Sequence, residues 1–196
     1  MSTNIPAGGH DSHSAVEEHL MAHNGYAIRP LRPEDIERYR RLRLQGLEEH
    51  PDAFGETAEH FKGVTSESLV ARLKSSENLG GFILVAEDCE QRFVGTVGLA
   101  VTDFEKTAHR AILWGMYILP EARGAGLARL LVEECLIRAK ACPRLELVLL
   151  SVVTSNQAAF NLYKLSGFEV YGTDPSVLKI GNRYFDEYLM VKSLRG

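Results

Sequence analysis

The pattern of apolar and polar positions divides the chain into a helical first part, a series of strands, and a closing alternation of strands and helices. Apolar residues recur at helical spacing from Pro33 to about Lys74, with a break at Pro51 and a loop over 51–55. Further helices are predicted from near Gly126 and over 155–165. Short runs of β-branched and aromatic residues predict strands at 26–31, 82–86, 93–101, 111–119, 145–153, 168–171 and 184–191.

This order of elements predicts an α/β (α+β) fold, with a central mixed sheet flanked by helices. The run 145–153 is short and continuously apolar, as expected for a parallel strand covered on both faces. Residues 1–24 are polar and contain four histidines. We interpret them as a mobile tail without a metal site, and expect one folded domain over 25–196.

The stretch 111–131 carries the first chemical signal. The strand 111–119 ends at Pro120, a glycine-rich turn follows over 123–128, and a helix begins near Gly126. Free backbone N–H groups and the positive end of a helix then point to one place, which suits a phosphate. On the turn alone, an ordinary strand-to-helix connection fits equally well. The turn lacks the lysine–serine pair of one nucleotide loop and the third glycine of another.

At this turn the chain resembles the GNAT superfamily of acetyl-CoA-dependent N-acetyltransferases. The family signature, Gln/Arg-x-x-Gly-x-Gly/Ala, is present here as Arg123, Gly124, Ala125, Gly126, Leu127 and Ala128. The segment 155–168 independently resembles the second signature of the family, an Asn, then Ala, then Leu-Tyr, ending in Gly-Phe. The resemblance extends over residues 25–194 and implies the GNAT fold.

The resemblance also implies a site and a reaction. Acetyl-CoA would be the co-substrate, and its acetyl group would pass to a primary amine by direct attack through a tetrahedral intermediate. Tyr163 would lie near the coenzyme sulfur and protonate the departing thiolate, and Asn156, on the same helix face, would bond the coenzyme arm. The alternative is a half-buried tyrosine with a solvated hydroxyl. The coenzyme would contact Met116, Tyr117, Ile118, Arg123, Gly124, Ala125, Gly126, Leu127, Ala128, Asn156 and Tyr163.

A glycine inside the central strand, Gly115, predicts a β-bulge. In the family this strand separates from its neighbour, and the coenzyme arm bonds backbone groups there, which would be those of Met116 and Ile118. A base is needed because an alkyl amine is mostly protonated at neutral pH. His109, Asp186 and Glu187 are candidates by residue type, and a water relay is an equal alternative.

By analogy with the family, the acceptor enters between the loop 51–55 and the last hairpin at 181–187. Phe54, Tyr184 and Phe185 would line an apolar pocket, and Asp186 and Glu187 would attract an amine cation. Two other functions stay open from the sequence: a catalytically silent coenzyme-A-binding sensor of the same fold, and a nucleotide-binding protein.

Composition narrows the class of protein. The 196 residues carry a net charge of −4, which gives no argument for a nucleic-acid or membrane partner. We expect Cys89, Cys135 and Cys142 to be reduced thiols in a cytoplasmic protein, with Cys135 in the core. The four arginines at 38, 40, 41 and 43 are interpreted as a solvated face, with a patch for an acidic substrate as the weaker alternative. The expected partners are acetyl-CoA and an amine, and a homodimer stays open.

Overall fold

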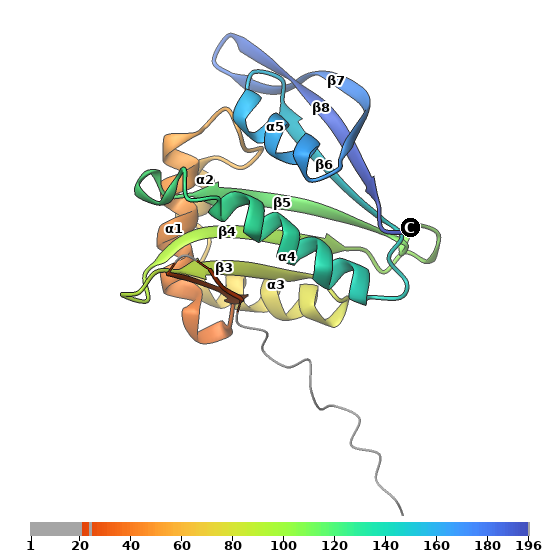
Figure 1. Ribbon diagram of the computed structural model, residues 1–196. Coiled ribbons are helices and arrows are strands. Elements are labelled where there is room, and N and C mark those ends of the chain that lie inside the picture. The colour runs from red at the N-terminus through yellow and green to blue at the C-terminus, as the bar shows by residue number, and fades with distance from the viewer. Residues whose placement is uncertain (1–20, 24, 196) are drawn as a thin grey trace, which may run out of the picture.

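The computed structural model describes residues 21–23 and 25–195, which form one eight-stranded sheet with helices on both faces (Figure 1). The strands are β1 Met21–His23, β2 Tyr26–Pro30, β3 Phe82–Glu87, β4 Phe93–Val101, β5 Arg110–Ile118, β6 Leu147–Val153, β7 Glu169–Ile180 and β8 Arg183–Ser193. The α-helices are α1 Ile36–Glu49, α2 Ala58–Lys62, α3 Ser66–Asn78, α4 Leu127–Ala141 and α5 Gln157–Leu165. Three short 3-10 helices are η1 Pro33–Asp35, η2 Glu105–Thr107 and η3 Pro120–Ala122.

The sheet is mixed, as predicted. Its strand order is β1-β2-β3-β4-β5-β6-β8-β7, and every neighbouring pair is antiparallel except β5 and β6. β1 pairs with β2 through Met21↔Ile28 and lies before the predicted start of the domain. Of the tail predicted over residues 1–24, residues 21–23 form β1, and residues 1–20 and 24 lie outside the described residues.

The helix boundaries follow local sequence signals. Pro33 opens η1, which leads directly into α1, and α1 ends at Glu49, just before Pro51. The single helical stretch predicted after the loop 51–55 is divided into two helices, α2 and α3, and a threonine caps the start of each. The hydroxyls of Thr57 and Thr65 accept hydrogen bonds from backbone N–H groups in the first turns of α2 and α3.

Two hydrophobic cores lie on opposite faces of the sheet. α4 and α5 cover the face seen in Figure 1, where Leu131 and Cys135 of α4 are fully buried against β3, β4 and β5. This confirms the predicted core position of Cys135, which is a free thiol. α1, α2 and α3 cover the other face, with Leu47 and Leu73 among the buried residues.

The final hairpin is longer than predicted. β7 runs on from the predicted end at Tyr171 to Ile180, across a segment that contains Asp174, Pro175 and Ser176. These residue types normally mark a turn. Here β7 is the edge strand, and its pairing with β8 shifts register between Asp174 and Leu178. An edge strand with a bulge accepts a proline, since that N–H is not needed in the ladder.

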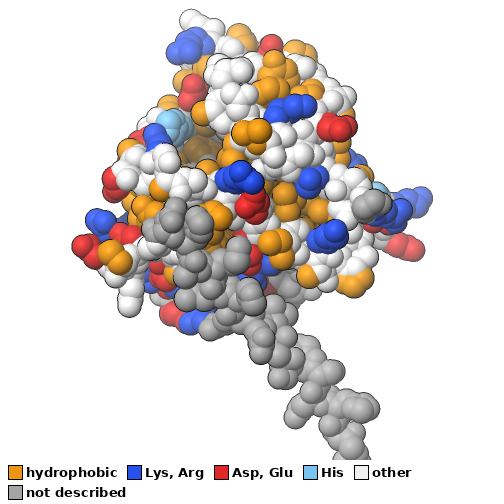
Figure 2. Space-filling model, viewed as in Figure 1, with side chains coloured by type: hydrophobic (Ala, Val, Ile, Leu, Met, Phe, Trp, Pro, Cys, Tyr) orange, Lys and Arg blue, Asp and Glu red, His pale blue; other side chains and the backbone are white. Residues whose placement is uncertain are grey.

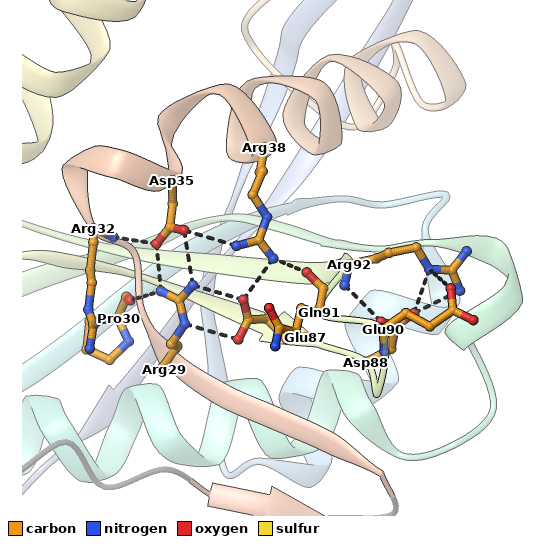
Figure 3. A network of polar contacts seen from close by, with 10 residues as sticks. All are labelled: Arg29, Pro30, Arg32, Asp35, Arg38, Glu87, Asp88, Glu90, Gln91 and Arg92. Atoms are coloured by element: carbon orange, nitrogen blue, oxygen red, sulfur yellow. Dashed lines mark hydrogen bonds and ion pairs between the residues drawn. The ribbon is translucent and has the colours of Figure 1, made fainter.

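The interpretation of the arginines at 38–43 as a solvated face is wrong for two of them. Arg43 is buried, with 6% of its surface exposed. Arg38 joins a network with Arg29, Asp35 and Glu87 that ties β2, the start of α1 and β3 together (Figure 3). Helical periodicity gives the direction of a side chain, but not which other elements cover it.

Charges of both signs are interspersed over the face that carries α4, without a large patch of either sign (Figure 2). Within residues 21–23 and 25–195, no helix is long and apolar enough to cross a membrane. The same residues contain no group of three or more His, Cys, Asp or Glu side chains arranged to hold a metal ion.

Candidate functional site

The predicted bulge in β5 is present at Gly115. Thr96 pairs with Tyr117 and Gly98 pairs with Trp114, so Gly115 and Met116 together oppose a single residue of β4. Gly115 has a φ of 67°, a conformation that a side chain strongly disfavours. The extra residue reverses the alternation of side chains along the strand. Tyr117 therefore packs on the α1 face, while Met116 and Ile118 belong to the core under α4.

Beyond the bulge, β5 is separated from β6. The two strands pair only from Arg110↔Leu147 to Ile112↔Leu149, after which β6 continues alongside β8 alone. Figure 1 shows β6 and β8 turning away from β5 at this point. The Leu119 N–H donates to the Val94 carbonyl of β4 at 2.8 Å. By alternation, the backbone groups of Met116 and Ile118 face the gap that β6 has left.

A cavity of about 370 Å³ lies at this gap. Of the residues predicted to contact the coenzyme, it brings together Met116, Tyr117, Ile118, Arg123, Ala128 and Asn156. Its other walls are His50, Ala53, Phe54, Ala158, Ala159 and Leu162, from the end of α1, the following loop and α5. Three segments, over residues 50–54, 116–128 and 156–162, thus meet around one opening.

The glycine-rich turn lies at the start of α4, next to Ala128 of this cavity. Gly124 and Gly126 have φ values of 81° and 78°, and a Cβ built on either would meet no atom within 4 Å. Within the described chain, the backbone amides of residues 124–129 donate to no acceptor. The side chain of Leu127 is buried and anchors the helix, and Ala125 is half-buried between the glycines. The turn therefore presents several free N–H groups on an open surface, which suits an anion.

Arg123 bends back from this turn towards the end of β5. Its Nε donates to the Ile118 carbonyl at 3.0 Å, and its Nη2 lies 3.3 Å from Glu49 Oε2 and 3.2 Å from His50 Nε2. The guanidinium thus closes one end of the cavity and already occupies part of the Ile118 backbone edge. A role for Arg123 in shaping the wall follows directly from these contacts.

Two residues at the end of α1 were missed in the sequence: His50, which lines the cavity, and Glu49, which holds the lining residue Tyr117. The Tyr117 hydroxyl donates to Glu49 Oε2 at 2.8 Å. Burial first, and then this bond to a carboxylate, raise the pKa of Tyr117 well above its usual range. Among the described residues that line the cavity, His50 alone carries a group of the usual general-base type. The signal in the sequence that could have found His50 is its place directly before Pro51, at the predicted end of the first helix.

The two residues of the second signature have different environments. Asn156 caps α5: its Oδ1 accepts from the Ala159 N–H at 3.1 Å, which leaves its side-chain NH₂ group free to donate into the cavity. Tyr163 is 6% exposed and packs against Phe168 in the core rather than lining the cavity. Its hydroxyl makes no hydrogen bond to a described residue. Burial raises its pKa, so the phenol keeps its proton at neutral pH.

The residues predicted for the base and the acceptor wall are not gathered at this cavity. His109 lies at the far end of β5, where its carbonyl accepts from Glu146 and Leu147. Asp186 caps the bulge of β7 by accepting from the Ser176 N–H, and Glu187 lies in the β6–β8–β7 ladder. Tyr184 and Phe185 are on the extended hairpin, outside the cavity lining, whereas Phe54 is part of it.

Comparison with known proteins agrees with this geometry. The model of the acetyltransferase (GNAT) family matches residues 43–168. Spermidine N(1)-acetyltransferase from Vibrio cholerae is 30% identical over 102 residues. That match covers 52% of this chain and 57% of the Vibrio protein, so the chain spans little more than half the length of this relative.

Solved structures share the whole fold. A GNAT-family acetyltransferase from Streptococcus pneumoniae superposes with a TM-score of 0.77 at 27% identity, over 86% of this chain and 98% of that one. The putative acetyltransferase yncA from Salmonella typhimurium, solved with acetyl-CoA, has a TM-score of 0.76 at 20% identity over 87% and 95%.

Proposed function

The chain belongs to the GNAT acetyltransferase family, and from this premise we propose that it transfers the acetyl group of acetyl-CoA to a primary amine of a small molecule or peptide. One observation carries the proposal. The separation of β5 from β6 leaves a free backbone edge at Met116 and at the Ile118 N–H, directly beside a turn with unpaired N–H groups; the Ile118 carbonyl accepts from Arg123. Acetyl-CoA carries an extended thioester arm and a diphosphate. The arm needs the backbone edge, and the diphosphate needs the N–H groups of the adjacent turn.

The coenzyme would bind along this line. Its diphosphate would accept hydrogen bonds from the backbone N–H groups of residues 124–129. The N-terminus of α4, which is the positive end of the helix dipole, favours an anion there. Its pantetheine arm would pair with the open edge of β5 as an additional strand, and Asn156 would donate to it from α5. Ala128 and Leu162 would pack against the arm without competing for hydrogen bonds.

The reaction needs two proton transfers. The amine nitrogen, once neutral, attacks the thioester carbonyl, and a tetrahedral intermediate forms. The C–S bond then breaks, and coenzyme A leaves as a thiol. His50 is the proposed acceptor of the proton lost by the amine, in place of the three candidates named from the sequence; its Nε2 accepts from Arg123 Nη2 and must be released from this contact to take the proton. Tyr163 is the proposed donor to the thiolate because it matches the tyrosine of the family's second signature. Its phenol is protonated at neutral pH, but it lies in the core outside the cavity lining, so donation requires its hydroxyl to become accessible from α5.

The acceptor class has two candidates within this function. The Vibrio relative acts on spermidine by its name, which favours a polyamine. The charges around a second cavity, on the other face of the sheet, favour a different class of amine. A chain that bound acetyl-CoA and acetylated no amine would be a coenzyme-A-binding sensor of the same fold.

Calorimetric titration with acetyl-CoA, followed by thiol release with a panel of amines, tests the proposal. Gly126→Glu is expected to abolish binding, because a carboxylate would fill and repel the phosphate site. Gly25→Glu is the matched control, since Gly25 has a φ of 82° and equally open space but lies away from the turn. Equal loss in both variants would trace the effect to backbone strain and would contradict the assigned site.

Tyr163→Phe and His50→Gln extend the same experiment to the chemistry. Each is expected to lower turnover about 100-fold or more while acetyl-CoA affinity changes little, as loss of an acid or base does. A turnover that is unchanged in either variant would remove that residue from its proposed role.

A further inference from the structure

A second cavity lies on the opposite face of the sheet, between α1, α3 and the strands. Its volume is about 270 Å³, and its lining includes Tyr39, Arg43, Glu56, Arg72 and Trp114. It adjoins the bulge of β5, because Trp114 precedes Gly115. A Cβ built on Gly115 would lie 3.7 Å from Arg43 Nη1. The Arg43 guanidinium therefore sits beside the point where β5 leaves β6.

Arg43 is buried without a full set of partners. Only 7% of its side chain is exposed, and its Nη1 has no hydrogen-bond partner in the described chain. The nearest carboxylate oxygen, Glu56 Oε2, is 3.7 Å from Nη2, which is beyond hydrogen-bond distance. A buried charged donor without an acceptor is costly, and a bound water, ion or ligand is one explanation for such a group.

Aromatic rings determine which edge of this guanidinium is available. Its carbon lies 4.5 Å from the centre of the Phe54 ring and 5.9 Å from that of Trp114. Rings cover the faces of a guanidinium and leave the N–H groups at its edge. Phe54 also lines the larger cavity at the β5–β6 gap, so Arg43 lies between the two cavities.

The lining of the smaller cavity favours an anion. Two arginines, the buried Arg43 and the exposed Arg72, line the cavity with one acid, Glu56, whose other carboxylate oxygen contacts His60. The Tyr39 hydroxyl also lines the cavity, and burial raises its pKa to about 12, so it remains a donor at neutral pH. A carboxylate matches paired donors of this kind, because a guanidinium can bind both of its oxygens.

We propose that the acceptor is an amine with a carboxylate close to it, as in an α-amino acid, and that Arg43 binds this carboxylate. The inference rests on the proposed function for the amine, and on the Arg43 cavity for the carboxylate. With the carboxylate at Nη1, an amine one carbon away lies at the bulge, next to the open edge of Met116. A polyamine offers no anion to Arg43 and brings more positive charge to it.

The test compares matched ligands. Calorimetry on the full chain with coenzyme A present would use amino acids paired with the amines that lack only the carboxylate, such as methionine with 3-(methylthio)propylamine and phenylalanine with phenethylamine. Spermidine is the polyamine probe. We expect some amino acid to bind at least about tenfold more tightly than its paired amine. Tighter binding of spermidine or of the simple amines would overturn the proposal.

Variants at α1 locate the effect. Arg43→Met should reduce the preference for the carboxylate to about one, and Arg43→Lys, which keeps the charge but not the paired donors, should retain part of it. Arg41→Met is the matched control, an exposed arginine on the same helix, and should leave the preference unchanged. An unchanged preference in Arg43→Met would assign the carboxylate to another group.

Failure of the proposed function gives a different result. If acetyl-CoA does not bind, the acetyltransferase proposal fails, but carboxylate binding to the free chain still reports on Arg43. If acetyl-CoA binds and amines without a carboxylate are acetylated as fast as amino acids, the acetyltransferase proposal stands and the carboxylate inference fails.

Discussion

Helix α1 carries two buried arginine environments that differ in how completely charge is matched. At its start, Asp35 accepts from Arg29 at 2.6 and 3.1 Å and from Arg38 at 3.1 Å, and Glu87 accepts from the same two arginines (Figure 3). Further along the helix, Arg43 has a carboxylate only at 3.7 Å and an unpaired Nη1.

The difference separates a structural role from a binding role. Two arginines and two carboxylates satisfy one another at the start of α1, and they fix β2, α1 and β3 in place. Nothing is left over for a ligand. At Arg43 the protein supplies the charge and the aromatic walls, but not the acceptor. Completeness of hydrogen bonding, rather than burial alone, distinguishes the two.

The largest expected effect on stability comes from breaking the matched network. Asp35→Ala leaves Arg29 and Arg38 without their shared acceptor, and should lower the free energy of unfolding by about 3 kcal/mol. Urea unfolding measures this. Asp103→Ala, at an exposed loop position, is the control and should have little effect. Equal stability of the two variants would show that the network does not hold the elements together.

The same network predicts a pH dependence. Burial opposes ionisation of Asp35, but the hydrogen bonds and charge of Arg29 outweigh it and lower the pKa of Asp35. A carboxyl with a lowered folded pKa stabilises fully above its unfolded pKa near about 4, and this stabilisation is lost as pH falls through the folded value. The wild type should therefore lose more stability than Asp35→Ala between neutral and acidic pH.

A smaller effect is expected at the unmatched site. Arg43→Met removes an unsatisfied donor and fills much of the same volume, so the free energy of unfolding should change by less than about 1 kcal/mol. The same urea experiment measures it. A loss as large as that of Asp35→Ala would mean that Arg43 is structural, and the contrast between the two sites would disappear.

The smallest effect is expected at the surface beside the network. Arg92 pairs with Asp88 at 2.8 Å, but 62% of its side chain is exposed (Figure 3). Arg92→Ala should leave the unfolding midpoint unchanged within error, because solvent screens such pairs. A clear loss would show that exposed charges also contribute to the network.

Local patterns predicted most of the fold. The strand at 93–101 was predicted with its observed bounds, and the central strand, the helix near Gly126 and the bulge at Gly115 are confirmed. These features depend on short-range chemistry: apolar runs, proline stops and a backbone conformation that favours glycine. The two signatures also predicted which segments contribute to the cavity at the β5–β6 gap.

Features that depend on distant segments were not predicted. Arg43 looks like one of several helical arginines until Phe54, Glu56 and Trp114 enclose it. Glu49 and His50 gain significance only because Arg123 and Tyr117 reach them from elsewhere in the chain. The length of β7 depends on its position at the edge of the sheet, where Pro175 is accepted. In each case the deciding partner lies far away in sequence.

The bulge in β5 shifts the alternation of side chains by one residue partway along the strand. In a regular strand, side chains on one face are two residues apart, but Trp114 and Tyr117 share the α1 face although they are three apart. The extra residue leaves an unfilled position in that row of side chains, because Gly115 has no side chain. Arg43 Nη1 lies beside this position, 3.7 Å from where a Cβ of Gly115 would be. Deletion of Gly115 would leave Trp114 and Tyr117 two residues apart on the α1 face, as in a regular strand. Tyr117 would keep its place beside Glu49, while the bulge and the unfilled position beside Arg43 would be lost.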